Sequence, residues 1–307
     1  MLIYNSKAGG GKQVSGLLRR LMGLQKRKPV GNFTPQEKVE HALQSLKRLN
    51  IDSVVEATQA AGHATELAKR AVHEGYDLVI VMGGDGTINE AVNGLAGSDV
   101  TLGVIPHGTA NVFALEMNLP IEVEAACRVI ASSQRRQIDL GLVNSRYFIC
   151  MLGVGFDAHV LKKADSKLKG IYGALAYIFV GVMELFIYRF RHIELKLDDQ
   201  PLTRKGYYAM VLNGRYYGGK LVLAPNANSS DGYLDVCIFK DKNIFHLFRY
   251  LLGFWEENNP PLEVEHFQCK QIEILKKGRH AIHVDAEYLG RTPARIRVAP
   301  KALWVAC

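Results

Sequence analysis

The feature that most constrains the fold is a repeated junction: a short apolar run, a glycine-containing loop and then a helical pattern. The loops read NSKAGGGK, GGDGTINE and PHGTAN, at residues 5–12, 83–90 and 106–111. The runs before the second and third loops, residues 76–82 and 100–106, are apolar almost throughout, as is typical of strands buried in a parallel sheet. This order predicts an α/β domain in which helices cover a parallel sheet.

The pattern changes after about residue 135. Apolar alternation, typical of half-buried strands, appears in segments separated by turn residues. These segments are YYAMVL, YLDVCIF, QIEILK, HAIHVD, ARIRV and ALWVA. The sequence therefore predicts an α/β domain over residues 1–135 and an antiparallel all-β domain over 136–298, with helices inserted near 167–188 and 244–253.

Composition limits the partners without choosing one. The 307 residues suffice for two domains, and the net charge of +8 favours nucleotide phosphates, acidic lipid or nucleic acid. Only the charge supports nucleic acid, so none is expected. The five cysteines form no CxxC motif and no secretory signal is visible, which predicts a cytoplasmic protein with reduced thiols. The apolar stretch 170–190 contains Glu184 and three glycines, so a buried helix is expected there, with a membrane span as the alternative.

The glycine loops predict a phosphate site. Glycine lets the backbone approach a phosphate closely, and the following helix presents unpaired N–H groups. Thr87 and Glu90 have the spacing of a capping box, which predicts a helix start just after Gly86. Asp85 would oppose a phosphate unless a cation intervenes, so it is expected to help hold magnesium, to cap the helix or brace the loop, or to combine these roles. Because the loops follow strand ends, they are expected to meet at one edge of the sheet.

Two blocks, VMGGDGTINEAVNGL and VIPHGTANVFALEMNLP, resemble the diacylglycerol kinase catalytic-domain family, which includes bacterial lipid kinases and sphingosine and ceramide kinases. IYNSKAGGGK, MLGVGFDAHV, NGRYYGGKLVLAPNANSSDGYLDV and HVDAEYLGRTP are similar to other family blocks, in order along nearly the whole chain. The resemblance implies an N-terminal α/β domain, a C-terminal β-sandwich, ATP in the cleft between them, and a final segment near 299–307 that returns to the first domain.

The resemblance also implies site residues. The ATP site is expected at Asn5, Ser6, Thr58, Gly83, Gly84, Asp85, Gly86, Thr87, Asn89, Glu90, Gly108, Thr109 and Asn111. Magnesium is expected at the Asp231 carboxylate and the main-chain carbonyls of Asn228 and Tyr233, although the residues alone favour a hairpin turn there. Glu287 is the implied proton acceptor, with Asp285 orienting or assisting; in an extended strand the two would share one face.

Three positions depart from the family pattern. Ala286 stands where Asp-Gly-Glu is usual, and alanine does not readily take a positive φ, so an ordinary backbone or an altered turn is expected. Ser6 replaces a proline, and Val112 replaces a frequent aspartate. None of the three removes a proposed catalytic or phosphate-binding group.

The expected function is an ATP- and magnesium-dependent lipid kinase, with diacylglycerol as the leading acceptor and phosphatidic acid as the product. The alternatives are an NAD kinase-like enzyme and a nucleotide-binding scaffold without activity. A lipid alcohol is the expected substrate, a transient anionic membrane surface is an expected partner, and a homodimer is left open. The candidate membrane contacts are Arg19, Arg20, Lys26, Arg27, Lys28 and the segments Lys162–Lys169 and Phe245–Trp255.

Overall fold

The computed structural model describes residues 1–5, 35–163, 184, 188–240, 264–275 and 280–307. Ser6, the basic residues between 19 and 28, and nearly all of the expected helices at 167–188 and 244–253 lie outside these ranges. Among the helices that the structure describes, none combines the length and the apolar character needed to cross a bilayer.

The first lobe has parallel strands in the order β2-β1-β3-β4. The strands are β1 (Leu2–Tyr4), β2 (Val55–Ala57), β3 (Leu78–Gly83) and β4 (Thr101–Pro106). The helices are α2 (Pro35–Arg48), α3 (His63–His73), α4 (Asp85–Leu95), α5 (Val112–Glu116) and α6 (Val123–Ala131). The predicted α/β architecture is confirmed.

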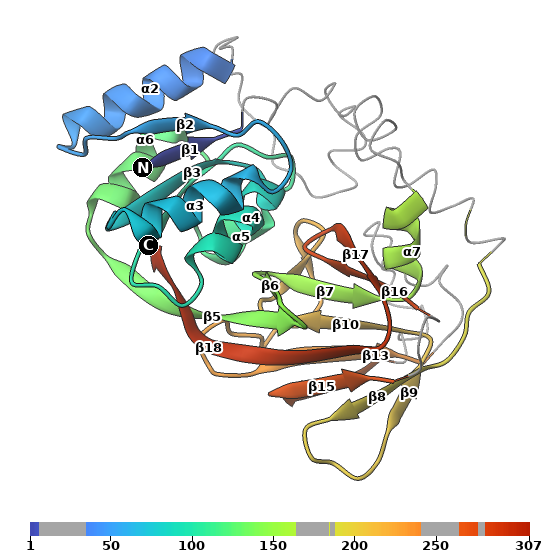
Figure 1. Ribbon diagram of the computed structural model, residues 1–307. Coiled ribbons are helices and arrows are strands. Elements are labelled where there is room, and N and C mark those ends of the chain that lie inside the picture. Colours follow the sequence, from blue (N-terminus) through green and yellow to red (C-terminus); the bar gives the residue numbers. More distant parts are fainter. Residues whose placement is uncertain (6–34, 164–183, 185–187, 241–263, 276–279) are drawn as a thin grey trace, which may run out of the picture.

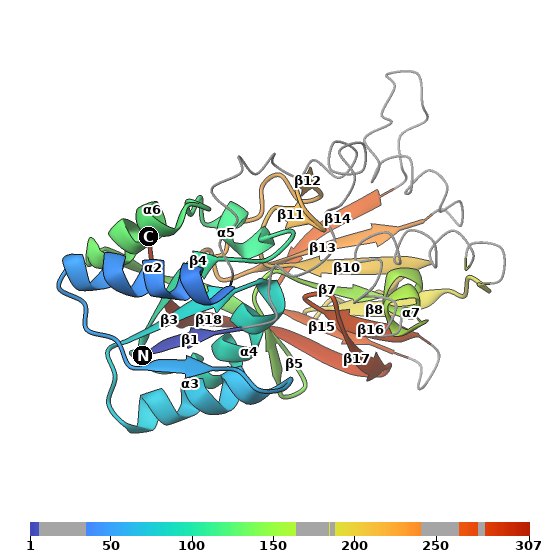
Figure 2. The ribbon, with the colours of Figure 1, turned by 90° about the horizontal axis from the view of Figure 1, so that it is seen from above.

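Strand β3 shows why helices cover both faces of this sheet. Val79 and Val81 share a core with residues of α3 and α4. Ile80 and Met82 point the other way, into a core with residues of α2 and α6. Figure 2 shows these two pairs of helices on opposite sides of the strands.

The second lobe is built from antiparallel strands. Its elements are β5 (Arg135–Val143), β6 (Arg146–Phe148), β7 (Met151–Val154), α7 (Phe156–Lys163), β8 (Ile193–Leu197), β9 (Arg204–Gly206), β10 (Tyr208–Leu212), β11 (Tyr216–Tyr217), β12 (Leu221–Val222), β13 (Leu234–Phe239), β14 (Val264–Cys269), β15 (Gln271–Ile274), β16 (Ala281–Val284), β17 (Glu287–Arg291) and β18 (Ala294–Ala306). One sheet has the order β14-β13-β10-β7-β16-β17. It shares a continuous apolar core with β8, β15 and the first half of β18, which confirms the predicted β-sandwich.

Strand β18 belongs to both lobes. Its first half pairs with β15, and Trp304 and Val305 near its end pair in parallel with β4 of the first lobe. A long antiparallel ladder with β5, interrupted between Ala299 and Leu303, runs beside it. The segments ARIRV and ALWVA, expected as separate strands, are thus one bulged strand. Both chain ends lie in the first lobe (Figures 1 and 2); the predicted domain boundaries themselves stay a prediction.

Candidate active site

A pocket of about 440 Å³ opens where the parallel strands end. It is lined by Asn5, Thr58, Gln59, Ala60, Ala61, Gly84, Gly86, Thr87, Glu90, Gly108, Thr109 and Glu287. Asn5 follows β1, the segment 58–61 follows β2, and the glycine loops follow β3 and β4. Glu287 comes from the other lobe, so the pocket lies between the two.

Half of the predicted site residues line this pocket. Gly83, Asp85, Asn89, Asn111 and Asp285 were also predicted but do not line the pocket; the contacts below show that four of them support it. Residues 59–61 line the pocket and were not predicted. Their only signal was their place in a strand-to-helix loop, because that loop lacks the glycine cluster that marked the others.

The glycines of the second and third loops permit a close backbone contact. A Cβ on Gly84 would lie 3.0 Å from the Cα of Gly108, and a Cβ on Gly108 would lie 2.6 Å from the Cα of Gly84. Gly83 is restricted in a different way, since its Cβ would lie 2.8 Å from that of Thr87. The glycine repeat therefore lets the two loops touch and form one floor of the pocket.

Helix α4 begins earlier than the capping-box spacing predicted. It starts at Asp85, with Gly84 as its N-cap residue. The Glu90 carboxylate accepts a hydrogen bond from the N–H of Ala64 at 3.2 Å, and Thr87 Oγ1 accepts one from Asn5 Nδ2 at 3.1 Å. The capping-box prediction is wrong because both side chains have partners on other elements. No side chain in the described part of the chain caps α4, which suits its start to an anion.

Asp85 braces the neighbouring loop. Its Oδ1 accepts a hydrogen bond from the N–H of Phe113 at 3.1 Å, at the start of α5. Burial raises the pKa of the Asp85 carboxyl, and the N–H groups of Phe113, Val112 and Asn111 oppose that rise. Asn111 in turn accepts a hydrogen bond from the N–H of Gly108 through Oδ1, at 2.8 Å. Of the roles considered for Asp85, these contacts match the loop brace.

Asp285 and Ala286 form a two-residue turn between β16 and β17. Their φ angles are 44° and 65°, both in the left-handed region, as in the type I′ turns that join tight hairpins. The extended arrangement that would place Asp285 and Glu287 on one face is therefore wrong. Ala286 does adopt the positive φ that its side chain disfavours.

The carboxylate of Asp285 is buried and directed into the protein. Oδ1 accepts hydrogen bonds from the N–H groups of Cys150 and Met151, at 3.0 and 2.9 Å. Oδ2 accepts them from the N–H of Ile149 at 2.8 Å and from Asn89 Nδ2 at 2.5 Å. Burial raises the pKa of Asp285, and the three main-chain N–H groups oppose the rise. With both oxygens engaged, Asp285 is placed to anchor the turn.

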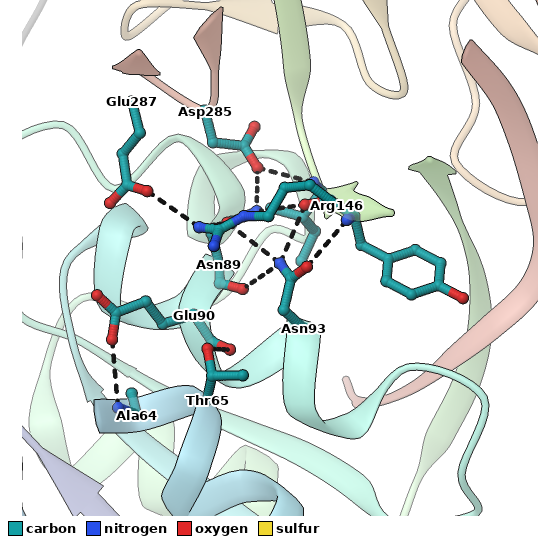
Figure 3. A network of polar contacts seen from close by, with 10 residues as sticks. Ala64, Thr65, Asn89, Glu90, Asn93, Arg146, Asp285 and Glu287 are labelled. Atoms are coloured by element: carbon teal, nitrogen blue, oxygen red, sulfur yellow. Dashed lines mark hydrogen bonds and ion pairs between the residues drawn. The ribbon is translucent and has the colours of Figure 1, made fainter. Parts of the chain in front are cut away.

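Glu287 lies next to the turn and reaches the pocket. Its Oε1 is 3.5 Å from the position that a Cβ on Gly86 would occupy. Its Oε2 accepts a hydrogen bond from Arg146 Nη2 at 3.0 Å (Figure 3). Sequence reasoning missed Arg146, because a single arginine in a short β-strand carries no recognisable signal.

The predicted metal residues lie in the turn before β13. Asp231 accepts a hydrogen bond from the N–H of Tyr233 at 3.0 Å, and Asn228 accepts one from the N–H of Ser230 at 3.1 Å. The turn is not a hairpin, because β12 pairs with β11 while β13 pairs with β10 and β14. None of the three predicted metal residues lines the pocket. Within the described ranges, no group of three or more acidic, histidine or cysteine side chains could hold a metal.

Comparisons with known proteins match both lobes. Residues 29–143 match the family model "Diacylglycerol kinase catalytic domain", and residues 150–307 match "YegS C-terminal NAD kinase beta sandwich-like domain". The chain is 33% identical over 255 residues to a diacylglycerol kinase of Bacillus subtilis (strain 168), covering 82% of this chain and 84% of the relative. It is 31% identical over 251 residues to a diacylglycerol kinase of Staphylococcus saprophyticus, covering 81% and 82%.

A solved structure has the same fold over almost the whole chain. It is a diacylglycerol kinase from Bacillus anthracis str. Sterne, with a TM-score of 0.71 and 23% identity over 99% of this chain and 95% of that one. Two domain matches in series and relatives above 30% identity agree with the glycine loops and the hairpin carboxylates. The chain therefore belongs to the diacylglycerol kinase catalytic-domain family.

Proposed function

We propose that this protein is a lipid kinase that transfers the γ-phosphate of ATP to the hydroxyl of diacylglycerol, giving phosphatidic acid. The observation that carries the proposal is the position of Glu287, which the second lobe places at the glycine-lined pocket of the first. A phosphate-binding floor and a carboxylate at its rim are the two parts that phosphoryl transfer to an alcohol requires.

The pocket supports a division of roles. The start of α4 and the touching backbones of Gly84 and Gly108 form a surface of main-chain atoms. There, main-chain N–H groups donate hydrogen bonds to the phosphate oxygens. Glu287 accepts the proton of the lipid hydroxyl while the hydroxyl oxygen bonds to the γ-phosphorus. The bond from that phosphorus to the bridging oxygen breaks, and ADP leaves.

Magnesium belongs to the proposal as well. Asp231, with the main-chain carbonyls of Asn228 and Tyr233, offers oxygen atoms only, a donor set that suits this ion. Asp231 already accepts a hydrogen bond from the N–H of Tyr233, so one carboxylate oxygen is partly engaged and the other is the better ligand.

The acceptor is inferred from the relatives, which are named diacylglycerol kinases. A long-chain lipid requires an enzyme that works at a membrane, and the net charge of +8 suits an anionic surface. Peripheral membrane association from the cytoplasm is therefore part of the proposal.

The experiment is phosphate transfer from γ-labelled ATP to a panel of acceptors in mixed micelles. The panel contains diacylglycerol, monoacylglycerol, sphingosine, ceramide and, in a micelle-free arm, NAD. We expect labelled phosphatidic acid that depends on magnesium and falls by at least about 10²-fold in Glu287→Gln, the size of a general-base contribution. Labelling of NAD alone would establish the nucleotide-kinase alternative. ATP binding without any labelled product would establish the scaffold.

A further inference from the structure

Arg146 connects the two lobes at the pocket. One terminal nitrogen, Nη2, donates a hydrogen bond to Glu287 Oε2 and another to Asn89 Oδ1, both at 3.0 Å. Asn89 lies on α4 of the first lobe, and Glu287 lies on β17 of the second. Figure 3 shows the guanidinium group between these two side chains. Through this one nitrogen, Arg146 holds the Glu287 carboxylate at a defined position relative to α4, the helix that begins at the second glycine loop.

Asn89, which accepts the hydrogen bond from Arg146, is itself held in place. Asn89 Nδ2 donates to Asp285 Oδ2 at 2.5 Å, and this buried carboxylate also accepts three main-chain N–H groups. With its amide nitrogen directed to a carboxylate, Asn89 presents its amide oxygen to Arg146. Asp285 thereby sets the orientation of Asn89, and Asn89 sets the position of the guanidinium group.

The backbone beside Arg146 is held by the same helix. Asn93, one turn further along α4, donates to the carbonyl of Tyr147 at 3.0 Å and accepts from its N–H at 2.9 Å. This side chain therefore makes both hydrogen bonds that a neighbouring strand would make with Tyr147. Arg146 is restrained at its backbone and at its head by two asparagines four residues apart on one face of α4.

We propose that Arg146 is a positioning residue for the proposed phosphoryl transfer, and the inference rests on that function. It holds the carboxylate of Glu287 toward the pocket in the orientation that accepts the hydroxyl proton, and it ties that orientation to α4. The guanidinium group keeps all of its own protons during the reaction. Lysine would be a weaker substitute, because its ammonium group sits on a flexible stem and does not fix the directions of its hydrogen bonds as the planar guanidinium group does.

The test is a double-mutant cycle in kcat with Arg146→Ala, Glu287→Ala and the double variant. Because Arg146 acts through Glu287, Arg146→Ala should lower kcat by roughly 10²-fold, the effect of a misplaced reacting group, and change the KM for ATP less than about threefold. In the Glu287→Ala background the same change should cost less than about threefold. An equal loss in both backgrounds, or no loss in the first, would overturn the inference.

Two further variants separate positioning from structure. Arg295→Ala removes another arginine–glutamate pair, with Glu273 at 3.2 Å. The Arg295 side chain is 86% exposed and neither partner lines the pocket, so kcat should not change. Arg146→Lys keeps the charge and should recover only part of the activity; full recovery would contradict the need for a planar head. If Arg146→Ala does not fold, Arg146→Lys takes its place in the cycle.

Failure of the proposed function has a different signature. If the wild-type protein phosphorylates no lipid, the kinase proposal is refuted. The interaction between Arg146 and Glu287 can still be tested in the absence of activity, by thermal unfolding. The cycle is then read in thermal midpoints: shifts that are less than additive support the link, and additive shifts overturn it.

Discussion

At the scale of single residues, the site depends on two residues whose backbone conformation is seldom adopted by residues other than glycine. Asp285 and Ala286 both have positive φ, and the turn they form sets the direction in which Glu287 leaves the hairpin. Asp285 is held there by its carboxylate, whereas Ala286 is exposed and has no comparable anchor. The strain at Ala286 is therefore offset by its neighbours.

Replacing Ala286 with glycine should stabilise the protein. A left-handed conformation costs a residue with a Cβ about 1–2 kcal/mol, while the extra freedom of glycine in the unfolded chain costs roughly 0.4–1 kcal/mol. We expect Ala286→Gly to raise the free energy of unfolding in urea by about 0.5–1 kcal/mol. Ala131→Gly, at the end of α6 with ordinary φ, should lower it by roughly 0.5 kcal/mol; a loss at both positions would contradict the argument.

The five cysteines should differ in reactivity. Burial raises the pKa of Cys127 to about 11 and of Cys237 and Cys269 to about 12, and it raises that of Cys150 well above the usual range. Cys307 alone is partly exposed. At pH 8 an aromatic disulfide reagent should modify one thiol in the native protein and five in denaturant, because the thiolate is the reacting form. Cys307→Ser should abolish the native reaction, and fast labelling that remains would contradict this assignment.

At the scale of elements, a buried carboxylate joins three segments of the second lobe. Asp139, on β5, accepts hydrogen bonds from the N–H of Gly232 and from the N–H of Lys301, both at 2.7 Å. The first lies in the turn before β13 and the second in the irregular part of β18. This side chain therefore supplies an acceptor for the N–H of Lys301, where the ladder between β5 and β18 is interrupted, and a second one for the turn before β13.

Asp139→Ala should be strongly destabilising. Asp139 is 1% exposed, and its removal would leave two partly buried N–H groups without their acceptor. Each unsatisfied group costs about 1–3 kcal/mol, and we expect a total loss of roughly 3 kcal/mol in chemical denaturation. Asp199→Ala, at an exposed position, should change stability by less than about 0.5 kcal/mol. Equal effects of the two substitutions would show that the Asp139 contacts add nothing.

At the scale of the whole molecule, the two lobes share a strand. The end of β18 completes the parallel sheet beside β4, and its beginning lies in the sandwich core. An ion pair between Glu116 of α5 and Arg215 of the second lobe, at 3.1 Å, adds another connection. The sheet of the first lobe therefore continues into the second lobe through β18, whereas Glu287 reaches the pocket from β17 of the other sheet.

The first lobe should not fold independently. A protein ending at residue 135 would leave the β4 edge uncovered, because β18 is its neighbour in the native sheet. We expect residues 1–135 alone to show no cooperative thermal transition by circular dichroism, and co-expression with residues 136–307 to restore one. A cooperative melt of the isolated fragment close to that of the full chain would contradict this expectation.

The sequence alone determined the architecture of the first lobe and the location of its phosphate loops. Continuous apolar runs and helical patterns are local, so the strands β3 and β4 and the buried faces of α3 and α4 could be read directly. The loops followed from them, because the carboxyl ends of parallel strands meet at one edge. The family motifs added Glu287, which periodicity would have left as a solvated acid.

The tertiary structure decided what depends on residues far apart in the chain. Asp285 became an anchor because its partners are the N–H groups of residues 149–151, more than 130 positions away. Glu90 and Thr87 do not form the expected capping box, because their side chains hydrogen-bond to other elements. Arg146 belongs to the site because it hydrogen-bonds to an asparagine of the other lobe. Hydrogen bonds of this kind depend on which segments the fold brings together, and local sequence patterns carry no record of that choice.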